Sequence, residues 1–174
     1  EVNLPLLAEE QKLSTDYDQV VGAQTAGWNG KERTFTEMQK MLVEENDREV
    51  REVSWRLMRE RILLDKPAIH ELWKKLFALR QQIAINAEKP DYRAYVWEKN
   101  SRFDYSPRDC KVFHTSIEKV VVPAASRVYE RRRKRLGLET IRPWDEYVDP
   151  LARPALRPFR RVTQLASGAA NIFD

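Results

Sequence analysis

The spacing of apolar residues predicts a helix at the start of the chain. Apolar residues from Leu4 to Val20 recur at roughly helical intervals, and Gly22 stands where a C-terminal cap would lie. We therefore expect a helix over about residues 4–20.

A short β-hairpin is predicted next, over about residues 23–35. Its centre is Asn29-Gly30, the dipeptide that most readily adopts the positive φ angles of a type I′ turn. Residues 23–28 and 31–35 flank this turn and would form the two strands.

Helical spacing returns after the hairpin. Thr36 can cap a short helix to about Val43, and Asn46 or Asp47 can cap a longer helix to about Asp65. This longer helix has two adjacent apolar stripes, which predict burial on more than one side. Pro67 suits the first turn of a further helix, whose apolar face is formed by Ile69, Leu72, Trp73, Leu76, Leu79, Ile83 and Ala84.

The second half of the chain is predicted to alternate helices with loops. A short aromatic helix around Tyr92, Tyr95 and Trp97 precedes the polar loop 100–105. Ser106-Pro107-Arg108-Asp109 is a strong start signal for a long helix that ends at Leu136-Gly137 and is kinked at Pro123. Residues 138–159 contain four prolines, which predict an extended segment with room for one short strand before a final helix.

These elements define a mainly α-helical chain, a bundle-like lobe over residues 1–174 with one hairpin near the N-terminus. The composition agrees, since 42% hydrophobic and 33% charged residues with only 5 Gly are typical of a helical protein with a well-solvated surface. The single cysteine, Cys110, cannot form an internal disulfide, so we expect a cytoplasmic location. The apolar stretch Val120–Ala125 is too short to span a membrane.

Two features indicate an excised fragment. The chain opens at Glu1 without an initiator Met, and it closes at Asp174 directly after an apolar run that no Gly or Pro ends. We therefore expect a longer parent protein.

Few residues have the chemistry of a catalytic or metal site. His70-Glu71-Leu72-Trp73-Lys74 begins like the zinc motif H-E-x-x-H, but Lys74 occupies the position of the second ligand. Cys110 and His114 are four residues apart on a helix, yet two ligands do not complete a site, and no orienting residue can be assigned for a Cys/His nucleophile. We predict no catalytic and no metal-binding residue in this chain.

The strongest basic run is Arg131–Arg135, near the end of the long helix. Such runs can bind phosphates or anionic partners, but cations at a helix C-terminus are also favoured by the helix dipole alone. The overall charge does not point to nucleic acid, because 31 basic residues are interleaved with 27 acidic ones. One alternative function is therefore an independent helical binding or regulatory module that uses Arg131–Arg135.

The order of several short motifs resembles the N-terminal part of oligoendopeptidase F-like zinc peptidases, of the thimet oligopeptidase family. The matching segments are Gly22–Thr25 with Trp28-Asn29-Gly30, Asn100–Cys110, Val121–Ala125, Leu136-Gly137 and Arg142–Asp145. The resemblance implies a helical enzyme that encloses a channel for short peptides, with zinc held by H-E-x-x-H and a later Glu. None of these ligands matches a position here, so the chain alone is expected to be inactive, with zinc present only in the full-length enzyme.

Two loop segments are predicted to line the substrate channel, because they combine polar and aromatic side chains suited to holding a peptide. The alternative is that these residues only cap and join helices. If the chain is a fragment, apolar faces such as that of Trp55, Met58 and Ile62 would be exposed, and self-association would follow. The predicted lining residues are Arg102, Asp104, Tyr105, Trp144 and Asp145.

Overall fold

A computed structural model describes residues 2–173 of the 174-residue chain. The mainly helical fold with one N-terminal hairpin is confirmed. The elements are α1 (Leu4–Gly22), β1 (Thr25–Trp28), β2 (Lys31–Thr34), α2 (Phe35–Glu44), α3 (Arg48–Asn86), α4 (Tyr92–Lys99), α5 (Pro107–Ser116), the π-helical turn η1 (Ile117–Val121), α6 (Val122–Arg135), the 3₁₀ turn η2 (Pro143–Asp145) and α7 (Val162–Phe173).

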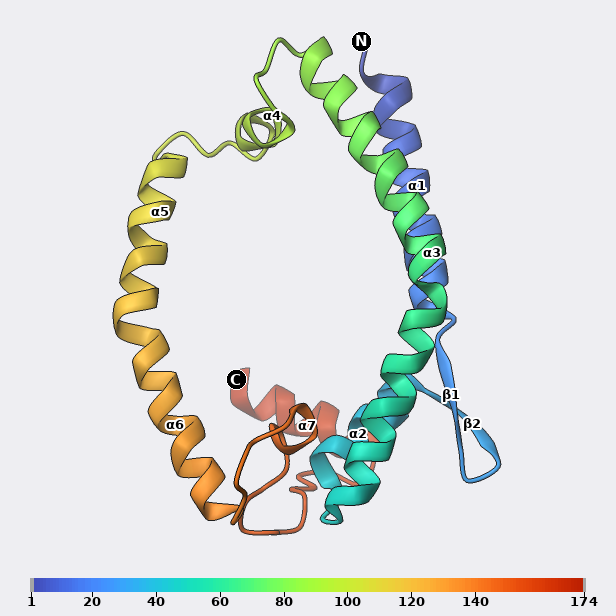
Figure 1. Cartoon of the computed structure of the whole chain (residues 1–174), viewed down its shortest axis with the longest axis vertical. Helices are drawn as coiled ribbons and strands as arrows, with labels where there is room; N and C mark the ends of the chain where they lie inside the picture. The colour runs from blue at the N-terminus through green and yellow to red at the C-terminus, as the bar shows by residue number, and fades with distance from the viewer. Residues whose placement is uncertain (1, 174) are drawn as a thin grey trace.

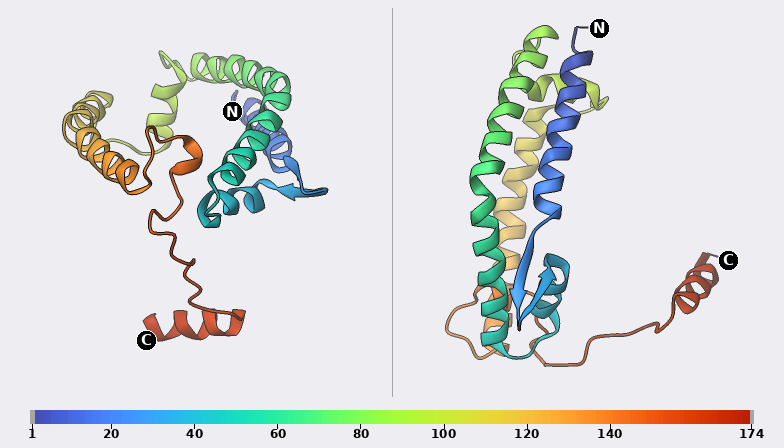
Figure 2. Two further views of the ribbon diagram at one scale, coloured as in Figure 1. Left: turned by 60° about the horizontal axis from the view of Figure 1, so that its bottom comes forward. Right: turned by 90° about the vertical axis from the view of Figure 1, so that its right-hand side faces the viewer.

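The helices form two limbs that stand apart and are joined at both ends (Figure 1). In the first limb, α1 packs antiparallel along α3. In the second limb, α5, η1 and α6 follow one another as a single long rod. The α4 segment joins the limbs at one end, and the segment containing η2 joins them at the other; α7 projects away from both (Figure 2).

The hairpin has the predicted turn. Thr25 pairs with Thr34 and Trp28 with Lys31 in an antiparallel register, and Asn29 and Gly30 have φ angles of 50° and 73°. Positive φ at both central residues is the requirement of a type I′ turn, which only Gly and Asn-like residues meet readily.

A small apolar core lies where the hairpin, α2 and α3 meet. Ala26, Met38 and Met58 are buried there, and Trp28 and Phe35 pack against them. The buried hydroxyl of Ser54 donates to the carbonyl of Met38 at 3.1 Å, so the polar group on this face of α3 is satisfied.

The predicted break at Pro67 is wrong, because α3 continues through it as one 39-residue helix. Pro67 lies on the solvent-exposed side of α3, opposite the buried side chains of Met58 and Leu76. An interior proline costs a helix about 3 kcal/mol. Packing of α3 against α1 and the hairpin core on both sides of Pro67 offsets this cost, an effect that the local sequence does not reveal.

The helix caps agree with the sequence at two helices and differ at one. Asp47 caps α3, and Ser106 forms a capping box with Asp109 at the start of α5, as predicted. The cap of α2 is Thr34 and not Thr36. Thr34 accepts from the backbone N–H of Glu37 at 3.3 Å and donates its own N–H to the Glu37 carboxylate at 2.8 Å, so the hairpin leads directly into the helix.

The long second limb contains a π-helical turn just before Pro123. Pro123 lacks an N–H, and within this turn the N–H of Val122 reaches back five residues to the carbonyl of Ile117. The predicted irregularity is therefore a widened turn. Within the described part of residues 138–159 no strand is present, because the segment turns into η2 instead; the final helix is present as α7.

Candidate functional site

One side of α3 carries a row of large side chains at helical spacing. Trp55, Ile62, Trp73, Phe77 and Arg80 recur at intervals that keep them on one face, beside the face that packs against α1. Both α4 and η2 contact α3 and lie on its side toward the second limb (Figure 1). This row, which we call the inner face of α3, therefore faces the interior between the limbs.

Three pockets follow the inner face of α3. Trp55 lines the first together with Pro143 and Tyr147, Ile62 and Trp73 line the second, and Trp73, Phe77 and Arg80 line the third. The second and third pockets share Trp73, so the three pockets follow one another along one helix.

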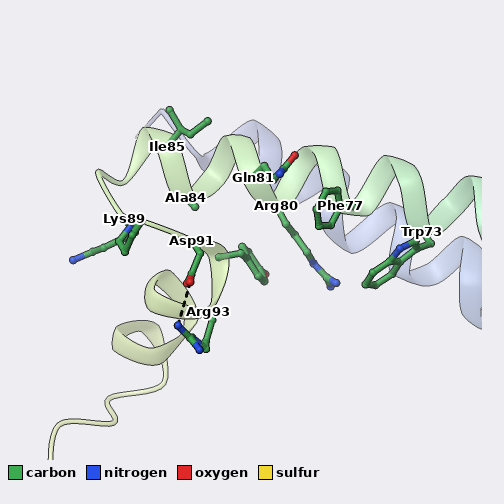
Figure 3. A pocket seen from close by; sticks show the side chains of 11 residues that line it. Trp73, Phe77, Arg80, Gln81, Ala84, Ile85, Lys89, Asp91 and Arg93 are labelled. Atoms are coloured by element: carbon green, nitrogen blue, oxygen red, sulfur yellow. Dashed lines mark hydrogen bonds and ion pairs between the residues drawn. The ribbon is translucent and has the colours of Figure 1, made fainter. Parts of the chain in front are cut away.

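The largest of these pockets, about 680 Å³, lies where α3 meets α4 (Figure 3). We call it the α3–α4 pocket. The rings of Trp73 and Phe77 lie 6.3 Å apart and are both about half exposed. Arg80 lies between Phe77 and α4, with its guanidinium 5.2 Å from the ring centre of Tyr92. The pocket thus combines the half-exposed rings of Trp73 and Phe77 with the guanidinium of Arg80, which is held against Tyr92.

Glu10 of α1 fixes the polar side of the α3–α4 pocket. Its Oε1 accepts from the Nε of Arg80 at 2.7 Å and from the hydroxyl of Tyr92 at 2.6 Å, although these residues are 70 and 82 positions away. Burial raises the pKa of Tyr92, and its hydrogen bond to Glu10 raises it further, to about 12. Tyr92 therefore remains a neutral donor, and three helices are tied together at this point.

The turn between α3 and α4 is set by backbone hydrogen bonds of a Schellman cap. The N–H of Lys89 donates to Ala84 at 2.9 Å and the N–H of Glu88 to Ile85 at 3.0 Å, while Glu88 has a φ of 55°. Asp91 then caps α4 by accepting from the N–H of Ala94 at 2.7 Å. This geometry aims Tyr92 back at α3.

The predicted lining residues of the loop 100–105 gather around one indole. The guanidinium of Arg102 lies 5.1 Å from the ring centre of Trp97, and the ring of Tyr105 meets the same indole edge-on at 5.2 Å. Arg102, Asp104 and Tyr105 are all exposed.

Trp144 and Asp145, the other two predicted lining residues, lie in η2, which follows α6 and contacts α3, whereas the loop 100–105 precedes α5. The structure thus does not bring the five residues together. Trp144 is buried, with its ring 5.4 Å from that of Trp55 and the guanidinium groups of Arg48 and Arg56 near its faces.

Asp145 is fully buried and is the centre of an ion-pair cluster. Arg48 donates to both carboxylate oxygens, at 3.0 and 2.9 Å, and Arg51 donates to one at 3.2 Å. Burial by itself would raise the pKa of Asp145, but the hydrogen bonds from Arg48, the Arg142 backbone and Arg51 outweigh it and hold the pKa below its usual value. Arg132 of α6 donates to the Asp145 carbonyl at 3.0 Å, so the cluster ties both limbs together.

Part of the basic run Arg131–Arg135 is engaged in hydrogen bonds to the backbone of the same chain. Besides its bond to Asp145, Arg132 donates to the carbonyl of Val148, and Arg133 donates to that of Leu138 at 2.7 Å. Guanidinium groups that cap backbone carbonyls have fewer donors left for a ligand.

Among the described residues, no three His, Cys, Asp or Glu side chains come together as metal ligands would. His70 and His114 are exposed on different limbs, and Cys110 lies one turn from His114 on α5. The residues present therefore do not fit a zinc site. Within residues 2–173, no helix is both long and apolar enough to cross a bilayer.

The sequence and fold place the chain in a known class of peptidases. Residues 41–174 match the family described as peptidase family M3, and the chain belongs to this family. The resemblance to oligoendopeptidase F-like peptidases that the motifs predicted is confirmed. Among curated proteins, none matches closely enough to count as a relative.

Two solved structures share the fold. One is described as a "putative oligoendopeptidase F" from Bacillus anthracis str. Ames, with 19% identity, a TM-score of 0.79 and 85% of this chain covered. The other is also described as a "putative Oligoendopeptidase F", with 23% identity, a TM-score of 0.82 and 87% coverage. The chain spans only 27% of the length of each matched structure.

Proposed function

We propose that residues 1–174 form one wall of the substrate channel of a zinc-dependent oligoendopeptidase that hydrolyses short peptides. The observation that carries this proposal is the inner face of α3, with its row of aromatic, apolar and basic side chains and its three pockets. Family membership supports the reaction class, and the three pockets offer places for the side chains of a peptide.

Zinc and the residues that act on the peptide bond would lie outside this chain, because the described residues do not fit a zinc site. We therefore assign no catalytic step to residues 1–174. Their role is to bind and orient the peptide, which contributes to turnover through positioning.

The predicted lining residues would contribute to the proposed channel in different ways, either by direct contact with the peptide or by holding the wall in shape. Tyr105 is 40% exposed and packs on Trp97, so it is available to a peptide. The buried carboxylate of Asp145 would act through the shape of the wall, since it is engaged by Arg48 and Arg51. We expect Tyr105→Ala and Asp145→Ala to impair hydrolysis in the full-length enzyme with zinc retained, through these two different routes.

We also propose a cytoplasmic location, because the lone Cys110 offers no disulfide. The rival function, a separate binding module based on Arg131–Arg135, is weakened because Arg132 and Arg133 cap backbone carbonyls. Binding of the isolated chain to an anionic polymer, abolished by Arg131→Gln with Arg135→Gln, would favour the rival.

The proposal is tested in the protein encoded by the whole reading frame. Trp73→Ala should lower kcat/KM for a short peptide about tenfold, since a half-buried aromatic contact is worth roughly 1.5 kcal/mol or more. The matched control is Leu64→Ala, which removes an exposed apolar side chain from the opposite side of α3. Equal kinetics of the two variants would refute the placement of the peptide on the inner face of α3.

A further inference from the structure

We propose that the α3–α4 pocket binds the C-terminal residue of a short peptide. Its large apolar side chain would pack on Trp73 and Phe77, and its free α-carboxylate would pair with Arg80. This inference deepens the proposed function, on which it rests for the identity of the ligand as a peptide.

The apolar half of the pocket fits a large side chain. Trp73 and Phe77 are 55% and 52% exposed, and Ile85, at the far end of the pocket, is 66% exposed (Figure 3). Such large apolar groups left half in water gain stability when a ligand covers them. A Phe, Leu or Trp side chain would cover both rings, whereas Ala would not reach across them.

The polar half of the pocket is lined by three cations, Arg80, Lys89 and Arg93, and each of them has a carboxylate partner. Glu10 pairs with Arg80 at 2.7 Å, Glu98 with Lys89 at 2.6 Å and Asp91 with Arg93 at 3.2 Å. The pair of Arg93 with Asp91 is solvent-exposed at both side chains, and such pairs contribute little. An anion entering the pocket would therefore meet, beside Arg80, a cation that can exchange its exposed partner for the anion.

Arg80 is the cation prepared for a carboxylate. Glu10 engages only its Nε, and its two terminal nitrogens make no hydrogen bond within the described residues. The guanidinium is held in place on the ring of Tyr92, whose hydroxyl is bound to the same Glu10. A fixed guanidinium with two terminal nitrogens open matches a carboxylate in geometry as well as charge.

The apolar and polar halves of the α3–α4 pocket together favour the C-terminal residue of a peptide. An interior residue of a peptide carries an apolar side chain but no charge on its backbone, and an acidic side chain carries the charge without the apolar surface. Only the C-terminal residue of a peptide carries both a large apolar side chain and a negatively charged backbone carboxylate. A free amino acid has both as well, but it would add a positive amino group beside Lys89 and Arg93.

The test is a titration of the 174-residue chain, followed by NMR, with three probes: N-acetylphenylalanine, its C-terminal amide and N-acetylalanine. For so small a ligand we expect a roughly millimolar Kd for N-acetylphenylalanine. The amide and N-acetylalanine should each bind about tenfold more weakly, and added salt should weaken only the carboxylate probes. Equal binding of the acid and the amide, or no binding up to about 20 mM, would overturn the proposal.

Two variants separate the two halves of the pocket. Phe77→Ala should weaken acid and amide alike, and Arg80→Lys should reduce the preference for the acid, because it removes the planar fork that matches a carboxylate while keeping a cation for Glu10. Leu64→Ala is the control and should bind as the unaltered chain does. If Arg80→Lys loses its thermal transition, Arg93→Gln takes its place, with a reduced preference for the acid expected.

The proposed peptide binding in the α3–α4 pocket and the proposed peptidase function can be refuted separately. Binding with the stated preferences, in a protein whose full reading frame has no peptidase activity, would support the pocket and refute the proposed function. Absence of binding, with hydrolysis sensitive to Trp73→Ala in the longer protein, would refute the pocket and leave the proposed function standing.

Discussion

Asp145 and Arg48, which are 97 positions apart, are joined by two hydrogen bonds of 3.0 and 2.9 Å. Arg51 donates to the same carboxylate, and Arg132 of the second limb donates to the carbonyl of Asp145. This buried cluster closes the lower end of the two-limbed structure, where η2 meets the start of α3. The stability of the fold should therefore depend on one carboxylate.

We predict that Asp145→Asn lowers the free energy of unfolding by about 3 kcal/mol or more, because it leaves Arg51 buried without its counter-charge. Urea denaturation of the isolated chain measures this loss. The control is Asp104→Asn in the exposed loop, with an expected change below about 0.5 kcal/mol. Similar values for the two variants would contradict the role assigned to Asp145.

Stability should fall at acid pH. The pKa of Asp145 is held low, and hydrogen bonds from Arg133 and Arg153 lower the pKa values of Glu130 and Asp149 to about 2. Groups whose pKa is depressed by folding stabilise the native state above their unfolded pKa, and this contribution is lost as pH falls toward the folded value.

The expected result is a nearly constant free energy of unfolding from pH 5 to 8 and a decline from about pH 4 toward pH 2. Asp145→Asn should flatten part of this decline. A stability that rises on acidification over this range would show that these ion pairs do not favour the native state.

The Schellman caps of α3 and α6 provide a matched pair of backbone tests. Glu88 and Gly137 occupy the same position after their helices, with φ angles of 55° and 66°. Because only Gly adopts this conformation without strain, Glu88→Gly should stabilise the chain by about 0.5–1 kcal/mol and Gly137→Ala should destabilise it by about 1 kcal/mol. Thermal unfolding measures both, and changes of the same sign would contradict the assignment.

The second limb should make the isolated chain self-associate. The face proposed from the sequence is partly wrong, because Met58 is 2% exposed and lies in the hairpin core. The exposed apolar side chains lie instead along α5, η1 and α6, where Phe113 and Val120 are 64% and 68% exposed. Sedimentation over a concentration series should show rising mass, reduced by Phe113→Ser with Val120→Ser; a strict monomer at all concentrations would contradict this prediction.

Local signals were sufficient for much of the fold. Asn29-Gly30 and the Ser106 cap act within a few residues, so the sequence could predict the hairpin and the start of α5. The continuity of α3 through Pro67 depends on packing against α1, which lies far away in the sequence.

The candidate site could be predicted less well. The sequence singles out residues such as Asp145 and Tyr105 because they are polar or aromatic, but it does not predict their partners, which come from other elements. The sequence does not predict the α3–α4 pocket, since Glu10 and Tyr92 meet only through the packing of α1 and α4 on α3. A Glu and a Tyr 82 positions apart give no signal in a single sequence.

Zinc content and peptide hydrolysis, measured in two purified proteins, show whether residues 1–174 are a non-catalytic part of a zinc peptidase. One is the 174-residue chain, and the other is the protein encoded by the whole reading frame. We predict one zinc per molecule and hydrolysis of a short peptide in the longer protein, and neither in residues 1–174, where no two further metal-ligating side chains join His70 or His114 among the described residues. One zinc bound tightly by the short chain and lost in His70→Ala, or a reading frame that ends near Asp174, would contradict it.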